Sequence, residues 1–146
     1  MRSVFLFSGQ GSQFKGMARD ICDTYSAARS VIDSMSTIVN EDIATLLWET
    51  EKEELSRSDK SQLAITAAEC AILAVLKEKD IVPAAVAGFS LGEFPALYAA
   101  GVLDFESVSC IVQKRGRIMQ KACEEIAAQT KGGAFQLYWI SYASLL

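Results

Sequence analysis

The chain has 146 residues, 51% of them hydrophobic and 22% charged, a composition that predicts one folded domain and excludes intrinsic disorder. Its net charge of −4 argues against binding to nucleic acid, which requires a basic surface. Because the sequence contains no His, the chain by itself cannot form a His-ligated zinc site, use a His general base or complete a Ser-His-Asp triad.

The first half of the chain is predicted to hold one strand followed by helices. Apolar β-formers over 4–8 end at a Gly-rich turn and predict a buried strand. Helical spacing of apolar residues predicts a helix over 16–35, and a short helix within 41–54 runs into an acidic, solvated stretch. A longer helix is predicted over 59–79, where alanines along one apolar stripe permit close packing against a neighbour.

The second half repeats the change from strand to helix. A second apolar run covers 84–89, and a helix is predicted over 91–100 with Gly101 as its terminator. Asp104 is a good N-cap for a long helix that reaches about residue 129 and has its apolar residues on one face. The order β-α-α-α-β-α-α favours an α/β fold with parallel strands joined by helical crossovers.

The character of the sequence changes after Gly132 and Gly133. Residues 136–146 carry no charge and are rich in aromatic side chains. Such a segment would be an aggregation-prone edge if it formed an uncovered terminal strand. We therefore divide the chain into a domain part, 1–134, and an atypical hydrophobic tail, 135–146.

Cysteine spacing and hydropathy bear on metal sites and location. The cysteines at 22, 70, 110 and 123 lack the CxxC spacing of metal or redox sites, so we expect no metal and mostly buried, reduced thiols. The apolar run at the N-terminus is too short for a signal-peptide core, and no stretch approaches the ~20 apolar residues that cross a bilayer. These features predict a cytoplasmic protein without a membrane segment.

Residues 88–92 match the G-x-S-x-G pattern of a nucleophile elbow, with Ser90 at its centre. Between a strand and a helix, such a Ser lies on a tight, strained turn at the positive end of the helix, and its Oγ points clear of the sheet. The backbone N–H of Leu91 would then be one donor to an oxyanion. The plain alternative is a turn that is rich in Gly and Ser and has no catalytic role.

The loop Gly9-Gln10-Gly11 follows the first predicted strand. In a parallel sheet this loop and the Ser90 turn lie at the carboxyl ends of strands, where such folds bind ligands. The N–H of Gln10 could supply a second donor to the same oxyanion, although a Gly-rich turn without a role has the same sequence. A phosphate-binding loop of the Walker type is excluded, because no G-K-[ST] follows.

Arg115 lies near the middle of the apolar stripe of the last predicted helix. A buried cation needs an anionic partner, and a guanidinium matches a carboxylate with two parallel hydrogen bonds. That partner could be a carboxylate on a ligand. It could equally be a carboxylate of this chain, or the side chain could extend to the surface.

Four segments stand in a characteristic order: Phe5–Gln13, Ser61–Ile65, Gly88–Glu93 and Lys114–Gln120. Together they resemble the malonyl-CoA:acyl-carrier-protein transacylase family, which includes the acyltransferase domains of fatty acid and polyketide synthases. The resemblance runs from about residue 4 to residue 134. It implies an α/β-hydrolase-like large subdomain with a parallel sheet, accompanied in the family by a small ferredoxin-like subdomain.

The resemblance also implies a ping-pong transfer without cofactor or metal. Ser90 would take malonyl from malonyl-CoA as an ester, and the phosphopantetheine thiol of acyl carrier protein would receive it. Gln10 and Leu91 match the oxyanion-hole positions of the family. Arg115 matches the arginine that binds the malonyl carboxylate, and Gln62 matches a supporting polar position.

The sequence departs from the family at Ser8 and Phe89, where Pro and His are usual. The family's catalytic His and most of its small subdomain lie beyond the point where this chain stops. We therefore expect a truncated chain that transfers malonyl poorly by itself. Two alternatives stay open: a non-catalytic remnant that binds acyl-CoA or carrier protein, and a serine esterase. An esterase with a Ser–Asp dyad would need a late Asp, and the last one here is Asp104.

Overall fold

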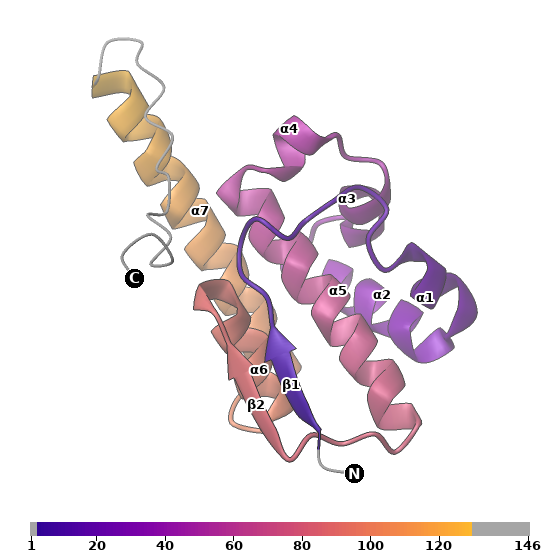
Figure 1. Cartoon of the computed structure of the whole chain (residues 1–146). Coiled ribbons are helices and arrows are strands. Elements are labelled where there is room, and N and C mark those ends of the chain that lie inside the picture. Colours follow the sequence, from indigo (N-terminus) through magenta and orange to yellow (C-terminus); the bar gives the residue numbers. More distant parts are fainter. Residues whose placement is uncertain (1–2, 130–146) are drawn as a thin grey trace.

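The computed structural model describes residues 3–129, so the predicted tail at 135–146 and the boundary at 134 lie outside the described residues. Strands β1 (Val4–Phe7) and β2 (Ala85–Gly88) pair in parallel, with Val4 opposite Ala85 and Phe7 opposite Gly88. Nearly all of the other regular elements are helices (Figure 1). The predicted α/β class with parallel strands is therefore confirmed.

The helices occupy most of the described chain. They are α1 (Arg19–Thr24), α2 (Ser26–Val39), α3 (Ile43–Trp48), α4 (Lys52–Leu55), α5 (Ser58–Glu78), the 3₁₀ turn η1 (Ser90–Gly92), α6 (Glu93–Ala99) and α7 (Phe105–Gln129). Between β1 and β2 the chain forms five helices, which supply the crossover that a parallel pair requires.

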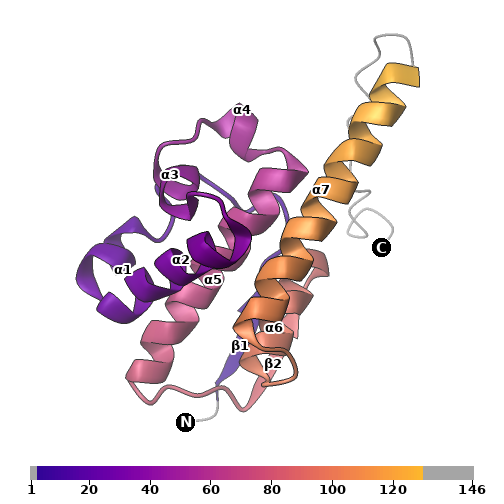
Figure 2. The ribbon, with the colours of Figure 1, turned by 180° about the vertical axis from the view of Figure 1, so that it is seen from behind.

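Helix α5 is the centre of the fold. Figures 1 and 2 show it between the α1–α3 group on one side and α7 on the other. Its small residues allow this close packing, since Ala64, Ala67 and Ala71 are fully buried. The prediction of one helix over 59–79 with an alanine stripe is confirmed within one residue at each end.

The helix predicted over 16–35 is wrong in its bounds and continuity. The chain leaves helical geometry at Tyr25, which has φ −120° and ψ 120°, and α2 then runs on to Val39. Ile21 and Ile32 both contact the core from separate helices, so the apolar spacing continues across the break. The acidic stretch after α3 also contains the short helix α4, whose Leu55 is buried.

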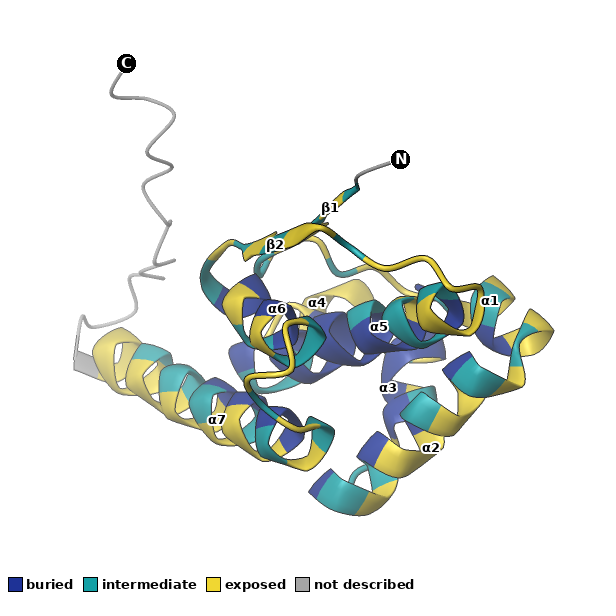
Figure 3. Cartoon of the chain, turned by 90° about the horizontal axis from the view of Figure 1, so that it is seen from below, coloured by how far each residue is buried: buried dark blue, intermediate teal, exposed yellow. Residues whose placement is uncertain are grey.

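The strand β1 is less buried than predicted. Val4 is 59% exposed and Leu6 is 79% exposed, whereas Phe7 is only 8% exposed. Figure 3 shows the two strands along one side of the molecule, with the helices on the other side. Within the described residues the sheet is therefore covered on one face, and side chains that alternate along β1 divide between the core and solvent.

Helix α7 begins as predicted, because the N–H of Ser107 donates to Asp104 Oδ1 at 2.7 Å. Its apolar stripe is buried only in part and only in the first half: Val108 and Val112 are fully buried, whereas Ile111 is 37% exposed and Ile118 is 59% exposed. The reason is visible in Figures 1 and 3, where the second half of α7 extends past the other helices. The apolar residues share one face of the helix as predicted, but within the described residues the second half of that face is not covered.

No helix within residues 3–129 is long and apolar enough to cross a membrane. The four cysteines are free thiols; Cys22 and Cys70 are buried, whereas Cys110 is exposed. Burial raises the pKa of the Cys70 thiol to about 12, so this thiol is an unreactive part of the core.

Candidate active site

The turn after β2 is a strained elbow. Ser90 has φ 53°, in the left-handed region that residues with a side chain rarely adopt. The flanking glycines are required by close approach: a Cβ on Gly88 would lie 2.1 Å from the carbonyl oxygen of Gly92, and one on Gly92 would lie 2.3 Å from that of Phe7. The predicted strand–turn–helix geometry is therefore confirmed, and the elbow closes over the end of β1.

The loop after β1 lies beside this elbow. Phe7 is opposite Gly88 in the sheet, so the two loops leave neighbouring strand ends. Gln10 is half-buried, and its Nε2 donates to Ser58 Oγ at 3.1 Å. Within residues 3–129 no group accepts a hydrogen bond from the Gln10 backbone N–H. The loop is thus placed as the parallel sheet predicts, with a backbone donor available.

Arg115 reaches the elbow from α7. Its Nη2 donates to Ser90 Oγ at 3.3 Å, its Nη1 donates to Gln62 Oε1 at 2.8 Å, and its guanidinium lies 5.6 Å from the centre of the Phe94 ring. It forms no salt bridge with any described carboxylate. A half-buried cation with only neutral partners is suited to bind an anion.

Gln62 fixes the direction of the Arg115 side chain. Gln62 is fully buried on α5, and while its Oε1 accepts from Arg115, its Nε2 donates to Met119 Sδ at 3.1 Å. The oxygen and the nitrogen of the Gln62 amide therefore each have a partner, and this pairing places the oxygen toward the guanidinium of Arg115. Sequence reasoning missed the parts of Met119 and Phe94. The spacing of Arg115 and Met119, four residues apart on one helix, was a signal for the first of them.

A pocket of about 340 Å³ joins these groups. Its lining consists of Phe89, Ser90, Glu93, Phe94 and Arg115. Leu91, the next residue along the elbow, is fully buried and is not part of this lining. Of the residues predicted for the site, Ser90 and Arg115 line this pocket, and Gln62 binds Arg115 from α5. The pocket therefore offers a hydroxyl and a cation, whereas Gln10 and Leu91 lie outside its lining. Such a space suits a short acyl group that ends in a carboxylate.

The fold and the site define an α/β protein with a serine on a nucleophile elbow and an arginine beside it. Residues 4–135 match the model of the acyl transferase domain, and the chain belongs to this family. Among curated proteins, it is 39% identical over 119 residues to the malonyl CoA-acyl carrier protein transacylase of Bacillus subtilis, and 39% identical over 124 residues to that of Haemophilus influenzae.

Solved structures show the same likeness. An acyl carrier protein S-malonyltransferase from Vibrio cholerae has a TM-score of 0.79 at 35% identity over 84% of this chain. A malonyl-transacylase in complex with its type II PKS acyl-carrier protein has a TM-score of 0.79 at 36% identity. The chain covers 38% of the Bacillus protein and 40% of the Haemophilus protein, so it spans about two fifths of these relatives.

Proposed function

We propose that this chain carries the acyl-binding half of a malonyl transfer site, with Ser90 as the nucleophile. The observation that carries the proposal is the position of Arg115, whose Nη2 lies 3.3 Å from Ser90 Oγ and which has no carboxylate partner among the described residues. We also infer that residues 4–134 form the large, α/β-hydrolase-like subdomain of an acyltransferase.

In the proposed reaction, Ser90 Oγ attacks the thioester carbonyl of malonyl-CoA. The negative charge that develops on the carbonyl oxygen is bound by the N–H groups of Leu91 and Gln10. Collapse of this intermediate breaks the carbon–sulfur bond, the proton lost by Ser90 ends on the sulfur, and coenzyme A leaves as its thiol while a malonyl ester remains on Ser90. The thiol of acyl carrier protein then attacks this ester and regenerates the Ser90 hydroxyl.

Arg115 would bind the free carboxylate of the malonyl group. Charge-assisted hydrogen bonds contribute about 1.5–3 kcal/mol each, so the guanidinium favours a carboxylated acyl group over a neutral one of similar size. Gln62 would hold the guanidinium in place, and the ring of Phe94 would support its other face.

The proton of Ser90 needs an acceptor during the attack. The resemblance implies a His for this role, and this sequence contains no His. An elbow serine without its base keeps only what binding and the oxyanion hole supply, about 10³–10⁴ over water in a serine protease. We therefore propose that these 146 residues by themselves transfer malonyl slowly. Malonyl-CoA and acyl carrier protein are the proposed partners, in the cytoplasm and without a cofactor. The names of the relatives and the solved complex with a carrier protein support this choice.

The test is acylation of the purified chain by malonyl-CoA, followed by intact-protein and peptide mass spectrometry. We expect one malonyl ester per chain, located on Ser90 and formed slowly, and none on the Ser90→Ala variant. Equal labelling of both proteins, or an ester on another residue, would reject the proposal.

A second candidate is a non-catalytic role in binding acyl-CoA, which the absence of His favours. Calorimetry with malonyl-CoA separates the two candidates, since heat of binding without an ester on Ser90 supports the binding role. The serine esterase alternative gains no support, because Asp104 is occupied as the N-cap of α7.

A further inference from the structure

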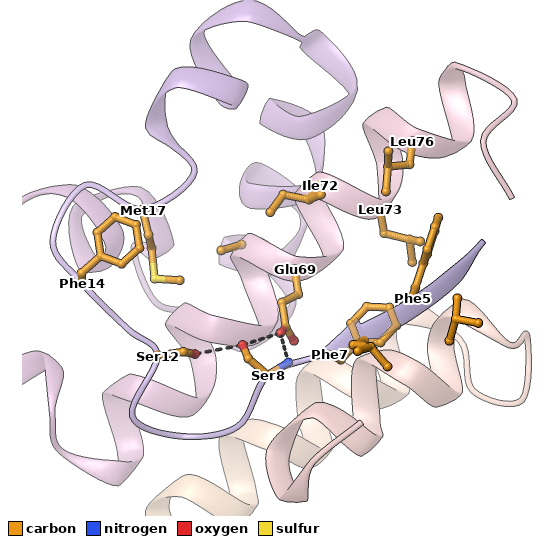
Figure 4. Close-up of a pocket in the computed structure, with 13 residues that line it drawn as sticks. Phe5, Phe7, Ser8, Ser12, Phe14, Met17, Glu69, Ile72, Leu73 and Leu76 are labelled. Atoms are coloured by element: carbon orange, nitrogen blue, oxygen red, sulfur yellow. Dashed lines mark hydrogen bonds between the residues drawn. The ribbon is translucent and has the colours of Figure 1, made fainter. Parts of the chain in front are cut away.

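A second pocket lies between β1 and α5 and reaches the loop after β1 at Ser8 and Ser12 (Figure 4). It has a volume of about 450 Å³, and its walls are mostly apolar, with Phe5, Ile72 and Leu73 among the lining residues. The lining nevertheless includes a carboxylate, that of Glu69 on α5. Its presence beside apolar side chains calls for a specific partner.

That partner is the backbone at the end of β1. Oε1 of Glu69 accepts the N–H of Ser8 at 2.6 Å and the hydroxyl of Ser8 at 2.7 Å. The Ser8 hydroxyl also lies 2.9 Å from that of Ser12, which in turn lies 3.0 Å from the carbonyl oxygen of Gly9. As Figure 4 shows, one hydrogen-bonded chain leads from α5 through Ser8 to Ser12.

The position is an unfavourable one for a charge. Burial raises the pKa of Glu69 above its ordinary value, against the hydrogen bonds from Ser8, which lower it. Oε2 is buried and has no hydrogen-bond partner among the described residues. One oxygen of Glu69 thus accepts from Ser8 and the other has no partner, so the contact that this side chain supplies is the one to the start of the loop.

The loop that Glu69 contacts lies beside the Ser90 elbow. Ser8 directly precedes Gly9 and Gln10, and a Cβ on Gly9 would lie 2.8 Å from the carbonyl oxygen of Phe89 in the elbow. The far side of the loop is held by the bond from Gln10 Nε2 to Ser58 Oγ. The contact between Glu69 and Ser8 therefore fixes the start of the loop that carries Gln10.

We propose that Glu69 is a positioning residue: through Ser8 it sets the direction in which the Gln10 N–H faces the reacting centre at Ser90. This inference rests on the proposed function for its catalytic consequence. Its structural content, the orientation of residues 9–11 by Glu69, can be measured without any reaction.

The first test compares Glu69→Leu, which keeps the side-chain size but has no acceptor, with Glu69→Gln, which keeps an oxygen acceptor. Ile72→Ala serves as the control, because Ile72 lines the same pocket one turn further along α5. Single-turnover acylation of Ser90 by malonyl-CoA gives a saturating rate and a half-saturating concentration. Loss of an oxyanion donor costs about 10²–10³ in rate, so we expect a misdirected donor in Glu69→Leu to lower the saturating rate about tenfold.

The half-saturating concentration should stay nearly constant in Glu69→Leu, because Arg115 does not contact Glu69. Both Glu69→Gln and the control Ile72→Ala should keep the saturating rate of the wild type. A saturating rate for Glu69→Leu equal to that of the wild type would overturn the proposal. A Glu69→Gln variant as slow as Glu69→Leu would also overturn it.

The second test reads the loop directly from the backbone amide resonances of Gly9, Gln10 and Gly11. We expect them to shift in Glu69→Leu and to stay in place in Glu69→Gln. If the wild type forms no ester on Ser90, the proposed function fails, and the amide resonances alone decide whether Glu69 positions the loop. Unchanged resonances in Glu69→Leu would then reject the positioning role of Glu69.

The third test approaches the same contact from the loop and does not depend on the folding of Glu69→Leu. Ser8→Ala removes one of the two donors, and Ser8→Pro removes both. We expect the amide resonances of Gln10 to shift little in Ser8→Ala and strongly in Ser8→Pro. Equal, small shifts in both variants would contradict a loop held by Glu69.

Discussion

Arg115 donates to the hydroxyl of Ser90 at 3.3 Å, although the two residues lie 25 positions apart and on different elements. The same guanidinium uses its other nitrogen to bind Gln62 on α5. An acyl group on Ser90 that ends in a carboxylate would therefore meet the cation within a few atoms of the ester. This short separation favours a small dicarboxylic acyl group over a long one, and it makes the selectivity testable.

Arg115→Ala should lower the rate of Ser90 acylation by malonyl-CoA about 10- to 100-fold, the equivalent of one lost charge-assisted interaction of about 1.5–3 kcal/mol. Acylation by acetyl-CoA, which offers no carboxylate, should change little. Arg117→Ala is the matched control, since Arg117 is exposed and binds Glu41. The rates are measured by mass spectrometry, and an equal loss for both acyl groups in Arg115→Ala would contradict a carboxylate-binding role.

Gln62→Leu should reproduce a part of the loss of malonyl acylation seen in Arg115→Ala, although Gln62 itself is not expected to contact the substrate. The substitution removes the acceptor of Arg115 Nη1 and leaves the guanidinium free to turn away from the pocket. We expect malonyl acylation to fall about tenfold and acetyl acylation to hold. In the double variant with Arg115→Ala, the Gln62 change should add nothing, because the two residues act through one contact. Additive losses would show that Gln62 acts elsewhere.

Several parts of this fold and site were predictable from local sequence. The elbow is marked by Gly88 and Gly92 on either side of Ser90, because only glycine fits at these two positions, where the backbone approaches so closely. Arg115 stands out since the helical period places it among apolar residues. Asp104 was recognisable as a cap. In each case the decisive signal lies within one element or its ends, where residue spacing carries the geometry.

Other parts depend on contacts that spacing does not encode. The break at Tyr25 is invisible in the sequence, because apolar residues keep their helical spacing across it. The bond between Ser8 and Glu69 joins residues 61 positions apart. The exposure of Ile118 follows from where α7 leaves the other helices. Such features are set by how the elements pack, so a pattern read along one chain predicts them poorly.

Gly92→Ala should test the closeness of the elbow to β1. The backbone of Gly92 has φ −60°, a conformation in which Ala would ordinarily stabilise a protein by about 0.4–1 kcal/mol. The added Cβ would instead lie 2.3 Å from the carbonyl oxygen of Phe7 and 2.6 Å from that of Ser8. We expect the free energy of unfolding to fall by about 3 kcal/mol in urea denaturation.

Gly101→Ala is the control for this substitution. Gly101 has φ +73° and open space around it, so Ala there should cost about 1–2 kcal/mol of conformational strain alone. The order of the two variants is the critical result. If Gly92→Ala were as stable as the wild type, the strand and the elbow could not meet as closely as the structure has them.

Glu41 should make stability depend on acid pH. It lies between α2 and α3 and accepts hydrogen bonds from Gln113 at 2.9 Å, Lys60 at 3.1 Å and Arg117 at 2.9 Å. Burial acts to raise the pKa of this carboxyl, but the three donors outweigh burial, and the pKa is lowered. A lowered folded-state pKa means that the contribution to stability is complete above the unfolded pKa of about 4.3 and is lost as the pH falls through the folded value.

We therefore expect Glu41→Gln to be less stable than the wild type near pH 7, with the difference shrinking as the pH falls below about 4.3. Urea denaturation of both proteins between about pH 3 and pH 7 measures that difference. Glu53→Gln, which removes an exposed carboxylate from α4, is the control and should show no such trend. A difference that stayed constant over this range, or grew toward acid pH, would mean that the charge of Glu41 does not hold α7 against the α2–α3 turn.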